Sequence, residues 1–349
     1  MKKLFFAGII ALAAATLCSC NKTQINQLPE GYGTVSIKIR NDELSTKAGV
    51  NKTASETSIK KLEVISLFDD GTVEKYGIFY PGTSESFTMD IKAGHRTLWV
   101  VANGPNIGAA KTIDDILAYK ADLADYQKGY FGFCMIGSDE VNIEPGVNNE
   151  CEVILSHICS KINLKHIYND LATGLGDITL DYAMLVNVSS LRTLGGQAID
   201  TAWYNKMGRA DETPQDSTHI IDGVDYLATA PDLTFGAYTG NKIVTKKNYN
   251  RQVHTFYCYP NQSESDTTGF TPNFTPRQTR LVVAATIGGK QYFYPITMPD
   301  LQPNQQYDVY LNIVGVGSDD PDIPVVKGAA ELEIGMTNWI YDEDIVENI

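Results

Sequence analysis

The histidines and glycines of the chain lack the spacings that metal and nucleophile chemistry require. None of the five histidines stands at the H-x-x-x-H or H-x-H spacing of a zinc site. No G-x-S-x-G elbow presents a nucleophilic serine, and Gly288-Gly289-Lys290 lacks the upstream glycine of a phosphate-binding loop. The acidic run 318–322 carries oxygen ligands without the regular spacing of a calcium loop, which favours a solvated turn. We therefore predict no catalytic residues, no metal and no cofactor.

One cysteine stands in a motif with defined chemistry. Residues 4–17 are an uncharged apolar run after two lysines, too short at about 1.5 Å per residue to cross a hydrocarbon core of about 30 Å. The run ends in Leu17-Cys18-Ser19-Cys20, which resembles a bacterial lipobox. We predict that residues 1–19 are a lipoprotein signal peptide and that the Cys20 thiol receives a diacylglycerol. Cys18 fits less well, because Leu17 would then fill the small-residue position. An ordinary signal peptide with a chance cysteine is the alternative.

Composition bounds the remaining possibilities. The chain has 349 residues, of which 43% are hydrophobic and 20% charged, so it can bury a substantial core, and two domains are expected. Its net charge is −14 and no basic stripe stands out, which argues against nucleic acid as a partner. Four cysteines remain beyond Cys20, too few for a disulfide scaffold. We expect buried thiols, with one disulfide left open, at Cys134, Cys151, Cys159 and Cys258.

The first strand and the loop after it have distinct patterns. Residues 34–40 alternate, with Val35, Ile37 and Ile39 on one face and polar residues on the other, which predicts a half-buried strand. Residues 41–57 are polar and without periodicity, which predicts a loop. A strand before such a loop is a segment that could detach, and we expect it to lie at one edge of its sandwich.

The rest of the chain is predicted to be mostly strands joined by turns. A helix is expected over 113–126, capped by Thr112 with Asp115 three residues later. Asp69-Asp70-Gly71 and Gly288-Gly289 predict hairpin turns, and residues 195–249 are expected to be a long irregular excursion. The remaining predicted strands cover 60–68, 73–79, 86–91, 97–102, 131–136, 141–143, 151–155, 179–187, 253–259, 281–287, 291–296, 306–314 and 331–339. This pattern indicates an all-β protein of sandwich domains.

Several blocks of the chain form a specific pattern when taken in order and spacing. These blocks are Gly33 to Ile37, Ala93 to Leu98 followed by Val100 to Asn103, Lys111 to Ile113, Tyr307 to Leu311, Gly315 to Gly317 with Asp320-Pro321, and the closing Trp339. Together they resemble the FimA-type fimbrillins, the lipoprotein-derived subunits of type V pili. The resemblance covers nearly the whole chain.

The resemblance implies two transthyretin-like β-sandwich domains with a minor helix, and assembly by strand exchange. A protease cuts the loop after the first strand, and the matching position here is Lys47 before Ala48. Most family members carry arginine there, so lysine departs from the pattern, and Arg40 at the strand end is a fallback. The displaced strand would carry Val35, Ile37 and Ile39. The donor segment of a neighbouring subunit would carry Leu332, Ile334, Met336 and Trp339.

The resulting hypothesis is a fimbrial structural subunit without catalytic activity that supports adhesion. Its expected organisation is a signal peptide (1–19), a tether and first strand removed on maturation (20–47), an N-terminal domain (48–156) and a C-terminal domain (157–349). Expected partners are other fimbrial subunits, a maturation protease, the outer membrane through the lipid, and host or bacterial surface ligands. The alternatives are a lipid-anchored surface adhesin or glycan-binding module that does not polymerise, and a secreted glycan-processing enzyme, which the absence of a carboxylate or nucleophile signature disfavours.

Overall fold

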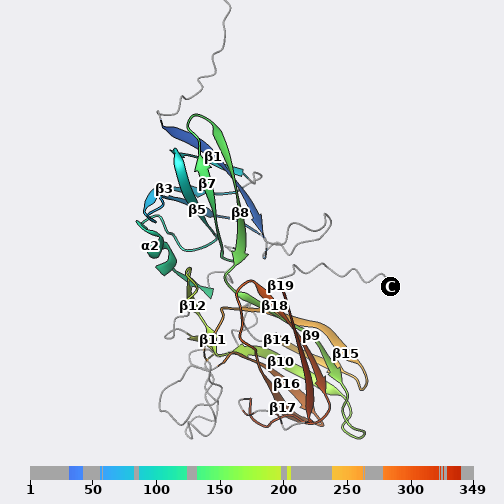
Figure 1. Ribbon diagram of the computed structural model, residues 1–349. Coiled ribbons are helices and arrows are strands. Elements are labelled where there is room, and N and C mark those ends of the chain that lie inside the picture. Colours follow the sequence, from blue (N-terminus) through green and yellow to red (C-terminus); the bar gives the residue numbers. More distant parts are fainter. Residues whose placement is uncertain are drawn as a thin grey trace, which may run out of the picture.

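A computed structural model describes residues 31–41, 56, 58–81, 86–123, 132–197, 203–205, 238–261, 263, 278–321, 323, 325 and 328–338. It shows two β-rich lobes joined end to end, with the short helix α2 (Ile113–Ala118) beside the first (Figure 1). The predicted all-β fold of sandwich domains with one minor helix is confirmed. Among the described residues, no helix is both long and apolar enough to cross a membrane.

The first lobe is a seven-stranded sheet in the order β3-β2-β5-β7-β8-β1-β4. Its two outermost strands lie close to each other, as the hydrogen bond of 2.6 Å from Lys75 Nζ of β3 to the Asp90 carbonyl of β4 shows. The sheet thus curls into a sandwich around a core that draws on six of its strands. The bounds are β1 Tyr32–Asn41, β2 Leu62–Leu67, β3 Val73–Phe79, β4 Ser86–Lys92, β5 Gly94–Ala102, β7 Met135–Ile143 and β8 Asn148–His157.

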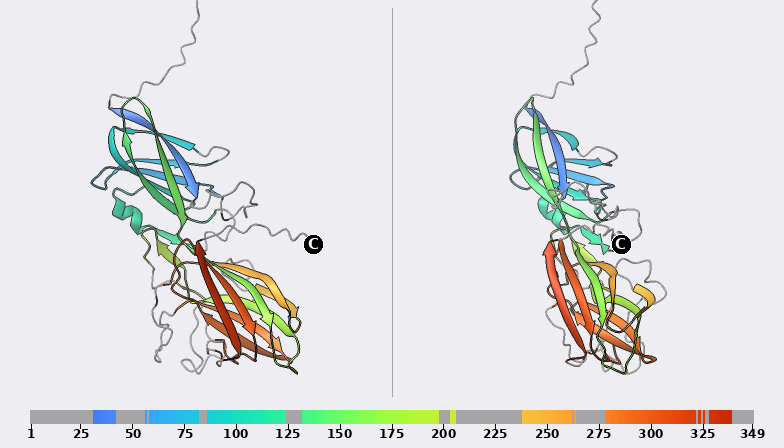
Figure 2. Two further views of the ribbon diagram at one scale, coloured as in Figure 1. Left: turned by 45° about the vertical axis from the view of Figure 1, so that its right-hand side comes forward. Right: turned by 90° about the vertical axis from the view of Figure 1, so that its right-hand side faces the viewer.

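The second lobe packs two four-stranded sheets together, in the orders β14-β10-β16-β17 and β15-β9-β18-β19 (Figure 2). The hairpin between β16 and β17 turns at Gly288 and Gly289, both with positive φ, as their sequence predicted. The bounds are β9 Ser160–Asn169, β10 Ile178–Val186, β14 Tyr238–Val244, β15 Tyr249–Cys258, β16 Arg280–Ile287, β17 Lys290–Thr297, β18 Gln305–Ile313 and β19 Ala330–Asn338.

The lobes are tied together by short strands and by a shared core. β6 (Lys120–Asp122), from the first half of the chain, pairs with β12 (Leu191–Thr193) from the second. A second short pair is formed by β11 (Val188–Ser189) and β13 (Trp203–Tyr204). The largest hydrophobic cluster contains Ile65 and Phe133 from the first half together with Phe256 and Leu311 from the second. The junction is therefore a packed interface rather than a loose linker.

Three sequence-based expectations about elements are wrong. The helix is capped by Thr112 and Asp115 as predicted, but it ends at Ala118, because the next residues extend to form β6 against β12. The two strands expected between 131 and 143 form one strand, β7. The excursion 195–249 contains β14, which closes one sheet by pairing with β10. In each case pairing with a distant segment overrides the local pattern.

Candidate functional site

The first strand is an internal strand of its sheet, second from one end. β1 pairs in parallel with β8 and antiparallel with β4, so both of its edges carry hydrogen-bond ladders. The expectation that it lies at an edge is therefore wrong, because β4 follows it on its free side. Removing β1 would leave two rows of unpaired backbone groups facing one slot.

The inner face of β1 is apolar and almost fully covered. Val35 and Ile37 are buried with no exposed surface, and Ile39 packs against the same cluster while partly exposed. Their neighbours in that cluster include Ile91 of β4 and Val153 of β8. Without β1, this part of the core would face water along a continuous stripe.

The outer face of β1 is held by polar contacts to β8. Lys38 Nζ lies 2.8 Å from Glu150 Oε2, and Arg40 Nη1 lies 3.0 Å from Glu152 Oε2. The hydrogen bond to Glu150 and that carboxylate's charge raise the pKa of the Lys38 ammonium. Both pairs are exposed, so they set charge complementarity between the strands more than they stabilise them.

Gly33 lets β1 begin close to a neighbouring turn. A Cβ at this position would lie 2.3 Å from the Glu144 carbonyl oxygen, which no real side chain tolerates. The turn itself bonds to β1, since Gly146 N donates to the Tyr32 carbonyl over 2.8 Å and Thr34 N to the Val147 carbonyl over 3.1 Å. A glycine at the start of this strand is thus required by the close approach of backbone.

The predicted processing positions lie outside the described residues. These are the lipidation residue Cys20 and the cleavage pair Lys47 and Ala48, and the donor residue Trp339 is outside as well. The last described residue of β1 is Asn41, and the description resumes at Glu56.

Glu56 is a buried carboxylate at the junction of the lobes. It is 1% exposed, and its Oε1 lies 3.0 Å from Nζ of Lys161, which has no exposed surface. The Tyr257 hydroxyl donates a short hydrogen bond to the same oxygen. The Glu56 carbonyl lies 3.0 Å from Nε2 of His157, and complete burial lowers the pKa of that imidazole. The C-terminal end of the predicted loop, 41–57, is therefore anchored at the junction.

Sequence reasoning did not find this anchor. Glu56 lies in a polar stretch with no distinguishing pattern, and only the tertiary structure buries it. Lys161 left no signal either, since it alternates with Ile162 and Leu164 as a polar residue of a half-buried strand would. A buried lysine of this kind requires a carboxylate partner, which the sequence alone could not name.

The predicted donor residues lie on β19, at the edge of the second lobe. β19 pairs antiparallel with β18 along its whole length, and its other side makes no ladder with any described strand. Leu332 is 46% exposed and Met336 62%, whereas Ile334 is partly buried against the core. Within one chain, β19 and β1 belong to different lobes and do not touch through a ladder.

The cysteine and metal expectations concern groups inside the lobes. Cys134, Cys151, Cys159 and Cys258 are all buried as free thiols. Burial raises the pKa of the Cys151 thiol to about 12, so it is a poor nucleophile. The part of the chain that the structure describes holds no group of three histidine, cysteine or acidic residues able to bind a metal ion.

Comparison with known proteins finds the same fold in several solved structures. No protein-family profile matches the chain, and no curated protein sequence matches it. The solved structure of fimbrilin FimA from Porphyromonas gingivalis W83 aligns with a TM-score of 0.63 at 14% identity, over 89% of this chain and 98% of that chain. A proposed cell adhesion protein from Bacteroides eggerthii aligns with a TM-score of 0.59 at 20% identity, over 90% of this chain and 98% of that one. Another from Parabacteroides distasonis gives 0.60 at 14% identity, over 89% and 100%. The chain thus has the two-lobed fold of a solved fimbrilin along nearly its whole described length.

Proposed function

We propose that this protein is a non-catalytic structural subunit of a cell-surface fimbrium that supports adhesion. The observation that carries the proposal is a fold shared with a solved fimbrilin over 89% of this chain, both lobes included. The lipobox-like residues ending at Cys20 support export as a lipidated outer-membrane precursor. Other fimbrial subunits are the proposed partners, and the extracellular fimbrium is the final location.

The proposed trigger is proteolysis between Lys47 and Ala48. A cut there separates β1 from the rest of the chain without touching any other described strand. The buried Glu56 then holds the new N-terminal segment at the junction through its contacts with Lys161 and Tyr257. Only β1 is free to leave, and its departure opens the slot between β4 and β8.

The proposed donor is the C-terminal segment of a neighbouring subunit, with Leu332, Ile334, Met336 and Trp339 entering the slot. On its own lobe β19 satisfies one ladder, whereas between β4 and β8 it would satisfy two. Each net backbone hydrogen bond contributes about 1 kcal/mol, and each newly buried aliphatic side chain about 1.5–3 kcal/mol. A head-to-tail joint of this kind does not close on itself and therefore extends into a filament.

A lysine substitution with a matched control tests this mechanism. The Lys47→Ala precursor should reach the surface, keep the N-terminus of the uncut form and remain monomeric. Lys52→Ala, which alters another lysine of the same stretch, should be cut and should form multimers that resist SDS. N-terminal sequencing of surface protein and an SDS ladder measure both. Normal multimers from the Lys47→Ala protein would refute this trigger, and monomers from every variant that bind surface glycans would favour a non-polymerising binding module.

A further inference from the structure

Arg192 is a buried cation whose side chain has no counter-ion among the described residues. It lies on β12, is 6% exposed, and its guanidinium makes no hydrogen bond or ion pair with any described residue, although its backbone pairs with β6. Its Nη1 is fully buried and has no hydrogen-bond partner. Desolvation lowers the pKa of this guanidinium, which shows how costly its charge is at this position. A buried arginine that no carboxylate of the described residues neutralises indicates a site for an external anion.

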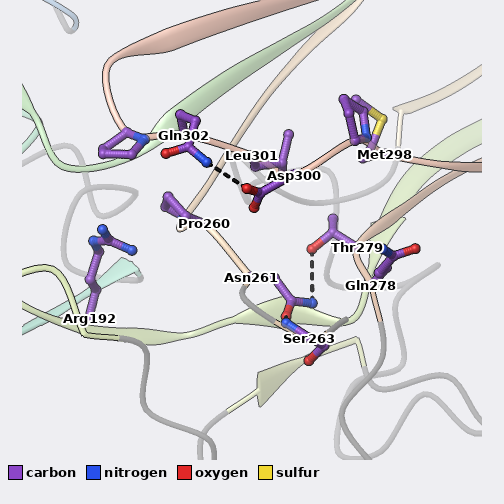
Figure 3. Close-up of a pocket in the computed structure, with 12 residues that line it drawn as sticks. Arg192, Pro260, Asn261, Ser263, Gln278, Thr279, Met298, Asp300, Leu301 and Gln302 are labelled. Atoms are coloured by element: carbon purple, nitrogen blue, oxygen red, sulfur yellow. Dashed lines mark hydrogen bonds between the residues drawn. The ribbon is translucent and has the colours of Figure 1, made fainter. Parts of the chain in front are cut away.

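Arg192 lines a pocket of about 660 Å³ on the second half of the chain. This volume lies within the range of small-molecule sites, roughly 300–1,000 Å³. Figure 3 shows Arg192 at one side of the pocket, Asp300 and Gln302 along a second, and Asn261 and Thr279 along a third. Strand β12 and the segments 260–263, 278–279 and 298–303 supply these walls, so the polar groups converge from segments far apart in sequence.

The walls are braced by hydrogen bonds. Asn261 Nδ2 donates to the Asn187 carbonyl over 3.1 Å and to Thr279 Oγ1 over 3.3 Å. Gln302 Nε2 donates to Asp300 Oδ2 over 2.9 Å, and Gln302 N donates to the Tyr307 hydroxyl over 2.8 Å. A polar pocket held in this way loses little freedom when a ligand binds.

We propose that this pocket binds a carboxylate-bearing monosaccharide, with the sugar carboxylate on Arg192 and ring hydroxyls on Asp300 and Gln302. A planar guanidinium matches a carboxylate through two parallel hydrogen bonds. The Gln302 amide can donate hydrogen bonds to sugar hydroxyls and accept hydrogen bonds from them, and the Asp300 carboxylate can accept them. The negative charge of Asp300 would repel a doubly charged phosphate. A singly charged sugar acid therefore suits the pocket better than a nucleotide. This site does not depend on the proposed fimbrial role.

The proposal is tested by titrating the purified full chain with D-glucuronate in a calorimeter. The methyl ester of glucuronic acid and D-glucose, which lack the charge, should bind about tenfold to a hundredfold more weakly, as expected for loss of a charge-assisted contact. Arg192→Met should abolish binding while circular dichroism shows an intact fold. Arg251→Met, which removes an exposed arginine of the same lobe, should leave binding unchanged.

Two further variants keep the test decisive. Gln302→Ala alters an exposed side chain at the pocket, so it should fold normally and weaken glucuronate binding several-fold. A quadruple variant, Asp342→Asn, Glu343→Gln, Asp344→Asn and Glu347→Gln, neutralises the acidic C-terminus. If glucuronate bound only to that variant, the chain's own carboxylates would fill the pocket and the proposal would fail. Acetate binding as tightly as glucuronate, or retained binding by the Arg192→Met protein, would overturn it too.

Discussion

Replacing Ile37 by alanine should destabilise the uncut protein by about 2–4 kcal/mol. Ile37 has no exposed surface and lies on β1 between two ladders. The substitution removes three carbon atoms, and at about 0.8 kcal/mol each their transfer accounts for about 2.4 kcal/mol. The cavity left behind adds to this, because β4 and β8 hold the surrounding backbone in place. If β1 leaves before assembly, as we propose, the same substitution should not weaken the finished joint between subunits.

Urea unfolding followed by circular dichroism measures this loss, with Ile154→Ala as the matched control. Ile154 is an isoleucine of the neighbouring strand β8 that is 45% exposed, so its truncation should cost less than about 0.5 kcal/mol. A loss below about 1 kcal/mol for Ile37→Ala would contradict the buried central position of β1. An equal loss for both variants would show that the distinction between the two faces is wrong.

Three more outcomes follow from the same structure. Gly33→Ala should lower the free energy of unfolding by about 1–3 kcal/mol because its Cβ meets a carbonyl, whereas Gly335→Ala, with open space around it, should be neutral in the same urea titration. Burial lowers the pKa of His157, so its contribution to stability is full above the unfolded pKa near 6.5 and is lost as the pH falls. The hydrogen bond to the Asp69 carboxylate raises the pKa of His95, so the contribution of His95 to stability grows as the pH falls. The free energy of unfolding, measured at several pH values between 7 and 5, should therefore depend less steeply on pH in His157→Gln and more steeply in His95→Gln. Equal slopes in both variants would disprove the assignment. Strand exchange removes the two cations of β1 that pair with glutamates of β8 and leaves those glutamates unpaired. Because salt screens the repulsion between carboxylates, the multimers should become more stable as salt rises from about 0.02 to about 0.5 M. Multimers that weaken instead would argue against this donor.

Local sequence patterns predicted the secondary structure correctly where pairing with distant strands favoured the same conformation. The alternation of Val35 and Ile37 gave a strand with those side chains inward, and the glycine pair 288–289 gave a tight hairpin. The pattern failed where a distant segment decided the outcome. Residues 120–122 continue a helical pattern yet form β6, because β12 supplies a ladder there. β14 was hidden in a polar stretch because it becomes a strand only through its ladder with β10.

The amino-acid sequence by itself determined the all-β class and the apolar face of the first strand, and it alone carries the prediction of the lipobox-like motif and of a polar loop around Lys47. These are properties of neighbouring residues, and neighbouring residues are what a sequence displays. Only the tertiary structure decided that β1 lies between two strands, that Glu56 meets Lys161 across the junction, and that Arg192 lines a pocket with no counter-ion among the described residues. Each of these depends on groups separated by tens to hundreds of residues, which the folding of the sheets brings into contact, and the cost of burying their charges is set by that contact rather than by the residues alone.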